Sequence, residues 1–416
     1  MNRSRSLPII IGLLLFLVVI FIGLLWGNYK FAKLNWSGRG FQVQWISIRS
    51  LVTDLSSPYS NSTTVQVQES IGNKNSFPFE NQSVYTSPLY SAIVAFPFAL
   101  IKDNILSRAI WLTAQLISLL VILLVGLKIT GWRPNWYVFL LFSGLMIFSY
   151  HIFIPWLDGG LAIWAALFLT LAFLAIRNHW DEIGGALLAL SAIHPHMTIL
   201  IIVFTLIWVV SKKKISILVW FCMTLISLTI VFYFLVPGWM LQYIRIIYNF
   251  SDYFTSASLG MLFKDLWPGV GKQLGLGITI LSGIVLIIEW YLALKKDFRW
   301  LLWTACLTLV MCPWIGLPVE IGYYIFLLLP LILVSAMLSE RWPRGGQWVA
   351  SLITAVVFAW EWLIILYSSS NSQPGMRLNL IIPLPVILFI CLYWVRWWAI
   401  KPKHFLMEEL KLGETI

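Results

Sequence analysis

The sequence predicts an all-α polytopic membrane protein, and three observations lead to this fold class. Of the 416 residues, 60% are hydrophobic and only 11% are charged, and the mean hydropathy is +0.86. A water-soluble domain cannot bury that much apolar surface. The apolar runs are each close to the ~20 residues that a helix needs to cross the hydrocarbon. They lack the period-two alternation of a membrane barrel, so we expect a helical bundle.

The charge pattern indicates membrane topology rather than nucleic-acid binding. The net charge is +11, but the basic residues stand in short clusters between apolar runs. We therefore expect no nucleic-acid partner, and we take the clusters to mark the cytoplasmic side. The cysteines lie inside apolar runs without CxxC pairing, which favours packing over disulfides or metal ligation: Cys222, Cys306, Cys312 and Cys391.

The N-terminus has the basic and apolar parts of a signal peptide, but its apolar part is too long and no small-residue cleavage site follows. We therefore expect a retained span over roughly residues 7–26 that begins in the cytoplasm. A large first outer loop, residues 27–105, follows it. The loop ends in a proline-containing segment, SPLYSAIVAFPFALIKDN, that we expect to form a helix at the outer interface.

The basic clusters also order the remaining spans. Further spans are expected at roughly 106–127, 135–153, 160–176 and 215–236. Between 177 and 212, a hairpin of two short helices that turns at His194-Pro195-His196 keeps both basic flanks inside, and proline suits a break there. A second outer loop, residues 237–272, is expected to hold short interfacial helices, and five later spans follow. The prediction is a single integral membrane domain, 1–416, with about twelve spans and both termini cytoplasmic.

Ionisable residues gather near the outer surface on this map. Such groups are costly at membrane depth and are functional candidates by default. The outer acids are Asp54, Glu69, Glu80, Asp103, Asp158, Asp252, Asp265 and Glu320, with Glu361 in the outer half of span eleven. The histidines at similar depth are His151, His194 and His196.

Several of these residues have a purely structural explanation as well. Asp158 in PWLDGG suits the N-cap of the fourth span, and Glu320 suits a first helical turn. His194 and His196 suit a wet turn, but they also suit hydrogen bonds to a phosphate. The sequence has no P-loop, GxSxG or HExxH motif, and it predicts no cofactor and no metal.

Four runs of the chain resemble glycosyltransferase family 87 of the GT-C superfamily. They are GFQVQWISIRSLVTDLSSPY, VYTSPLYSAIVAFPFALI, residues 158–176 and GGALLALSAIHPHMTILIIVF. GLPVEIGYYIFLLLP is a weaker fifth likeness. The resemblance implies a GT-C-like bundle that transfers a sugar with inversion. The donor would be a polyprenyl-phosphate sugar, with mannose as the sugar, and a lipid or glycan the acceptor.

Two positions depart from the family pattern. Gly40 stands where the family has its catalytic Asp in the first outer loop, and His194 stands where a Lys is common. The chain then either uses another acid or is impaired as a catalyst. Asp54 and Asp158 are the expected catalytic acids, and Glu80 is a further possibility. The expected substrate-binding residues are His194, His196, Arg49, Arg108, Tyr85 and Glu320.

Two competing functions stay open at the level of sequence. One is a transporter or lipid flippase with twelve spans; the large first outer loop and the lack of an internal repeat argue against it. The other is a non-catalytic GT-C-like relative, which the glycine at position 40 suggests. All three functions place the protein in the cell membrane among membrane lipids, and the enzyme would have its active site on the outer face.

Overall fold

The computed structural model describes residues 6–34, 38–71, 84–249, 263, 267–315, 321–342, 345–368 and 382–401. Within these ranges the chain forms α-helices and short 3₁₀ helices, and no β-strand. This confirms the all-α class. The longest helix, α1 (Ser6–Leu34), covers the predicted first span, with apolar side chains such as Leu15 and Val19 exposed.

Six helices in the described ranges are long and apolar enough to cross a membrane, or seven if one bent pair counts as a single span. The architecture agrees with an all-α membrane protein, but it does not confirm twelve spans. The helices at three predicted crossings are shorter: α8 (Ala162–Arg177), α10 (Pro195–Ser211) and α16 (Phe298–Met311). Among the six are α5 (Asn104–Thr130), α11 (Ile215–Leu235) and α15 (Gly271–Ala293).

The predicted third span is two helices, α6 (Trp136–Phe148) and α7 (Tyr150–Asp158), bent by 57°. The break falls at Ser149, whose backbone is extended and whose hydroxyl donates to the carbonyl oxygen of Met146. A hydroxyl that bonds the preceding turn competes with the helical ladder. Hydropathy alone could not reveal this bend, because both halves are apolar.

The chain divides into two compact units. The first unit comprises 1–85, 91–118 and 156–160. In it, α2 (Arg39–Asp54) packs on α3 (Asn61–Ile71) and on α4 (Ala92–Ala99). The N-terminal part of α5 belongs to the same unit, and the Asp103 carboxylate caps it by accepting the N–H of Ile105 at 2.9 Å. The segment predicted to form an interfacial helix is helical, as the short 3₁₀ helix η1 (Leu89–Ser91) followed by α4, and its place at the interface stays a prediction.

The second unit comprises 86–90, 119–155 and 161–416. Its N-terminal half packs α9 (Asp181–Ser191) against α8 and α11. The chain breaks between α9 and α10 at His194, and Pro195 opens α10 where its missing N–H costs nothing. The predicted break at His194-Pro195-His196 is confirmed. One helix, α12 (Trp239–Asn249), lies inside the predicted second outer loop.

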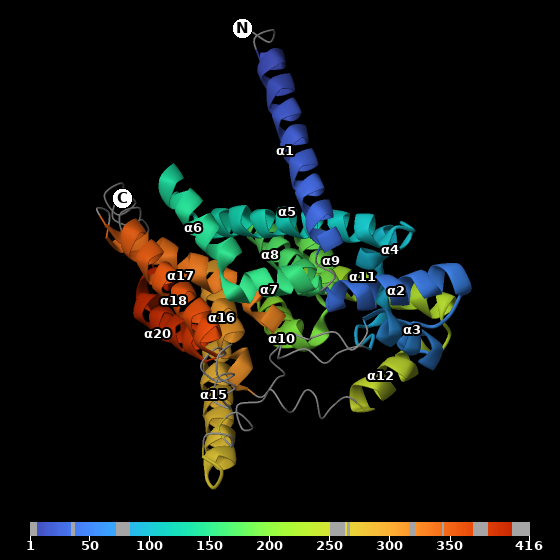
Figure 1. Ribbon diagram of the computed structural model, residues 1–416. Coiled ribbons are helices and arrows are strands. Elements are labelled where there is room, and N and C mark those ends of the chain that lie inside the picture. Colours follow the sequence, from blue (N-terminus) through green and yellow to red (C-terminus); the bar gives the residue numbers. More distant parts are fainter. Residues whose placement is uncertain are drawn as a thin grey trace. The chain divides into compact units, whose positions relative to one another are not determined.

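The C-terminal half of the second unit is the orange-to-red group in Figure 1, which includes α16, α17 (Leu328–Arg341), α18 (Gly346–Ser368) and α20 (Pro383–Ile400). Helices α16 and α17 pack with α20 and with η3 (Ile321–Leu327), and α17 also packs with α18. In the span that contains α17, 89% of the apolar window is buried, against 11% in α11. Helix α17 is therefore a core helix, whereas α11 presents most of its apolar surface outward.

Tryptophan side chains tie this helical group together. The indole of Trp303 donates to the carbonyl oxygen of Leu392 at 3.0 Å and joins α16 to α20. In the same group, the carboxylate of Glu289 in α15 accepts a hydrogen bond from the guanidinium of Arg396 in α20 at 2.9 Å. Buried Cys306 and Cys312 pack among these helices, and all four cysteines are free thiols, as their apolar settings predict.

Candidate functional site

The Asp158 carboxylate is the centre of a polar site in the first unit. Asp158 ends α7, and its Oδ1 accepts the backbone N–H of Gly40 at 2.9 Å across 118 residues of sequence. The N-cap of α8 is Leu161, without a side-chain hydrogen bond. Asp158 is therefore not the helix cap that its sequence context also allowed, and its carboxylate instead joins α7 to α2.

Gly40 permits this contact because it has no side chain. A Cβ built at residue 40 would lie 2.1 Å from Asp158 Oδ2 and 2.8 Å from the backbone nitrogen of Gly160. Neither contact is tolerable at those distances, and the glycine backbone alone allows such an approach. The Asp158 carboxylate thus fills the space that a side chain at position 40 would occupy.

Arg108 provides a positive charge beside the carboxylate. It lies in the second turn of α5, is 2% exposed, and donates from Nη2 to the carbonyl oxygen of Leu157 at 3.4 Å. Its charge interacts favourably with that of Asp158. A Cβ at Gly38 would lie 2.7 Å from the guanidinium carbon, so the backbone at Gly38 lies directly against the cation. Two of the predicted site residues therefore lie together.

Aromatic packing holds these elements in place. Trp111 is fully buried, and its ring centroid lies 4.8 Å from that of Phe98 and 5.8 Å from that of Phe41. On the next turn, the Gln115 amide donates to the carbonyl oxygen of Gly160 at 2.8 Å. The loop that follows Asp158 is consequently fixed to α5 by a side chain of α5. Packing and hydrogen bonds of this kind hold catalytic side chains to within about 0.5 Å of a productive position.

Asp54, the other predicted catalytic acid, lies far from this site. It is the last residue of α2 and is exposed. Fourteen residues of helix separate it from Gly40, which corresponds to about 21 Å at 1.5 Å per residue. One proton-transfer site cannot include both carboxylates, and the geometry favours Asp158.

Two other predicted substrate-binding residues of the first unit have structural partners. Arg49 donates to the carbonyl oxygens of Ala99 and Ile101 at 3.0 and 3.2 Å and so holds the end of α4. The hydroxyl of Tyr85 forms a hydrogen bond with that of Ser91 at 2.8 Å, in a buried position. Both side chains therefore form hydrogen bonds within the segment 27–105 and connect parts of that segment to each other.

His194 and His196 belong to the second unit and lie against each other. Their ring centroids are 4.2 Å apart with an edge-to-face angle of 81°. His194 is the N-cap of α10, and both side chains are half-buried. The hydroxyl of Tyr90 supports the turn by donating to the carbonyl oxygen of Ala192 at 3.0 Å. Glu320, and Glu80 among the further acids, lie outside the described residues.

The second unit contains a buried histidine–glutamate pair that no sequence motif connects. His151 Nε2 lies 3.6 Å from Glu361 Oε1, and the two side chains are 2% and 4% exposed. The His151 ring stacks on Tyr324 with centroids 3.9 Å apart. Glu361 also lines an apolar pocket of about 320 Å³ between α18 and α20. Both residues stood out as ionisable groups in apolar runs, but only the fold shows that they meet.

Comparison with known proteins assigns no family to this chain, so its class rests on its fold. No family model, curated protein or solved structure matches it. The described residues define an all-α protein with six or seven helices suited to a membrane, and with a carboxylate–guanidinium site in its first unit.

Proposed function

We propose that the chain is a membrane glycosyltransferase of GT-C-like fold. It moves a sugar, mannose by the resemblance, from a polyprenyl-phosphate donor to a lipid or glycan acceptor. In this proposal the bundle has about twelve spans, both termini are cytoplasmic, and the active site is on the outer face of the cell membrane.

The observation that carries the proposal is the position of the Asp158 carboxylate. It lies against Gly40, the position at which the family that the chain resembles has its catalytic Asp. Residue 40 cannot supply a carboxylate, but Asp158 supplies one at the same place. The glycine therefore does not argue for an impaired enzyme.

The chemistry is a single displacement with inversion. The acceptor hydroxyl oxygen attacks the anomeric carbon, and the bond from that carbon to the lipid-phosphate oxygen breaks. The Asp158 carboxylate takes the proton of the hydroxyl as a general base. The lipid phosphate leaves with the bonding electrons, and Arg108 offsets the negative charge that it gains. Arg49 and Tyr85 position the loop, because their polar groups already bind it.

Transfer by the purified protein tests this function. We would incubate it in lipid nanodiscs with polyprenyl-phosphate sugars and envelope lipids and follow the radiolabelled sugar. General-base catalysis contributes about 10²- to 10⁴-fold, so Asp158→Asn should lower the rate by at least ~100-fold. The amide oxygen of the substituted side chain can still accept the Gly40 N–H, so the fold should persist.

Asp54→Asn is the matched control, because Asp54 is exposed and distant from Gly40. It should keep the wild-type rate. Full transfer by Asp158→Asn, or loss of transfer by Asp54→Asn alone, would contradict the assignment of the base. Failure of every donor would contradict the enzyme itself and favour a non-catalytic relative.

Transport is the second candidate function, and two observations favour it. The α6–α7 pair is bent by 57°, and the His151–Glu361 pair is buried among apolar helices. Broken helices and buried ionisable pairs are both common in transporters. The test is movement of a lipid-linked sugar across the membrane of proteoliposomes. Transport is favoured over transfer if Glu361→Gln abolishes this movement and Asp158→Asn leaves it intact.

A further inference from the structure

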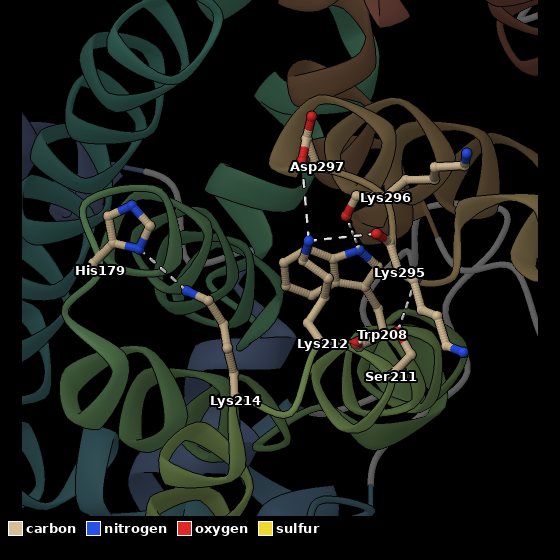
Figure 2. Close-up of polar contacts among 8 residues, drawn as sticks. All are labelled: His179, Trp208, Ser211, Lys212, Lys214, Lys295, Lys296 and Asp297. Atoms are coloured by element: carbon tan, nitrogen blue, oxygen red, sulfur yellow. Dashed lines mark hydrogen bonds and ion pairs between the residues drawn. The ribbon is translucent and has the colours of Figure 1, made fainter.

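The turns that follow α10 and α15 form one polar cluster in the second unit, as Figure 2 shows. Lys212 Nζ donates to the carbonyl oxygen of Lys295 at 3.4 Å. The hydroxyl of Ser211 accepts the backbone N–H of Lys295 at 3.1 Å, and the indole of Trp208 donates to the carbonyl oxygen of Lys296 at 3.1 Å. All three contacts are made to backbone atoms of the turn between α15 and α16. The side chains of Lys295 and Lys296 are therefore not needed to hold the turn in place.

The turn that follows α8 joins the same network. Lys214 Nζ lies 3.3 Å from His179 Nδ1 and 3.1 Å from Asp181 Oδ1. On the opposite side of the cluster, Lys212 Nζ lies 3.9 Å from Asp297 Oδ1. Turns from three different parts of the chain are therefore held together at one end of their helices.

Each of these three turns places a non-glycine residue in the left-handed region. The residues are His179, Lys213 and Lys295, with φ of 60°, 59° and 59°. Glycine adopts this conformation without the steric cost that a side chain brings. Topology requires positive charge on this side of a span but not at these positions. A histidine or lysine therefore occupies each of these three positions, although glycine would adopt the same backbone conformation at a lower steric cost.

The cluster is strongly basic and borders apolar surface. The segments 177–182, 211–214 and 295–299, which we call the basic surface, contain seven Lys or Arg and three Asp or Glu. Large side chains at its edge are exposed: Trp180 by 54%, Ile215 by 60% and Tyr291 by 74%. Two candidate spans, α11 and α15, meet it. Lysine beside exposed aromatic rings at the ends of spans is typical of the headgroup layer.

A pocket of about 630 Å³ opens at this surface. Its lining includes three arginines, Arg133, Arg177 and Arg299, and two acids, Asp297 and Glu340. Arg177 and Arg299 lie close enough to repel each other, and Glu340 attracts Arg299. A phosphate between the two guanidinium groups would replace this repulsion with two attractions.

We propose that the pocket binds the phosphate of an anionic membrane lipid. Arg133, Arg177 and Arg299 contact the phosphate oxygens, while Lys213 and Lys295 attract the lipid to the pocket. The acids orient the cations, since Asp297 pairs with Lys212 and Glu340 attracts Arg299. The apolar surface of α11 and α15 next to the basic surface receives the acyl chains. This site is independent of sugar transfer, and either activity can fail without the other.

Binding of defined lipids to the full-length protein tests the proposal. We would titrate the delipidated protein in detergent with phosphatidylglycerol or phosphatidylcholine and count bound lipids by native mass spectrometry. Phosphatidylglycerol should bind more tightly, and Arg177→Gln with Arg299→Gln should weaken it at least ~10-fold, as expected for charge-assisted bonds. Arg177 also donates to the carbonyl oxygen of Lys128, so this variant alone does not suffice.

The second variant is Lys213→Gly with Lys295→Gly, which removes two charges and relieves two left-handed side chains. A surface charge near anionic lipid is worth about fivefold in affinity, so this variant should bind phosphatidylglycerol at least ~10-fold more weakly. Its lipid-free melting temperature should equal or exceed that of the wild type. Lys213→Arg with Lys295→Arg keeps both charges and should bind normally.

Three results would overturn the proposal. One is equal affinity for phosphatidylcholine and phosphatidylglycerol. Another is unchanged phosphatidylglycerol binding in both charge-removing variants. The third concerns the melting temperature of the delipidated protein. If inorganic phosphate alone raises it as much as phosphatidylglycerol does, the ligand is a soluble anion and not a lipid.

Discussion

At the scale of residues, the contact between Gly40 and Asp158 joins two positions that the sequence keeps 118 residues apart. Sequence reasoning named both residues, one as a missing acid and the other as a candidate acid. It could not join them, because the contact depends on how α2 and the end of α7 pack. Nothing local to Gly40 signals that a carboxylate fills its side-chain space.

The His151–Glu361 pair makes the same point for buried ionisable groups. Each residue stands out in an apolar run, but the partner of each is far away in the sequence. Removing one member of the pair takes a polar partner from a buried group, which typically costs about 1–3 kcal/mol. The pair therefore predicts strong coupling between two residues that no motif connects.

A double-mutant cycle measures that coupling. His151→Phe and Glu361→Leu should each lower the melting temperature of the purified protein. The double variant should lose less than the sum, with a coupling energy of roughly 0.5–3 kcal/mol. Additive losses would show that the two side chains do not interact.

At the scale of elements, the sequence predicted where most helices lie but not how each one ends. Helix α11 spans 215–235 against an expected 215–236, and α5 spans 104–130 against 106–127. Long apolar runs with basic flanks fix such positions well. The expected span at 160–176 and the short helix after His194 agree with α8 and α10. The Ser149 bend and the shortness of α16 escaped prediction, because hydropathy does not report local hydrogen bonding or helix length within a bundle.

The Asp103 cap of α5 gives a prediction at this scale. Asp103→Ala removes an acceptor for the N–H groups of Ile105 and Leu106. Loss of such a cap costs about 1 kcal/mol, so the melting temperature should fall by a few degrees. Asp103→Asn, which can still cap the helix, should melt close to the wild type. An unchanged melting temperature in Asp103→Ala would show that the cap does not stabilise α5.

At the scale of the whole molecule, charge asymmetry gives the expected orientation. The left-handed Lys213 and Lys295 lie in turns beside the candidate spans α11 and α15, where cytoplasmic lysines are expected. The basic surface is therefore the side that we expect to face the cytoplasm. The structure gives the first and last residue of each described helix, and the direction in which a helix crosses the membrane is measured by experiment.

Reporter fusions test that orientation. A fluorescent protein that matures only in the cytoplasm should be active when fused after Lys214 and inactive when fused after Gly238, because α11 lies between the two points. A phosphatase that is active only outside should give the opposite pattern. The same signal at both points would show that α11 does not cross the membrane.

The most direct test removes the Asp158 side chain, supplies a small carboxylate from solution in its place, and measures sugar transfer. Asp158→Gly should lower the rate by at least ~100-fold, the lower bound for a lost general base. This variant vacates the space beside Gly40 that the Asp158 carboxylate fills, so added formate should raise its rate about 10-fold or more, in proportion to the formate concentration. Full activity of Asp158→Gly, or no rise in its rate with formate, would contradict the assignment of Asp158 as the base beside Gly40.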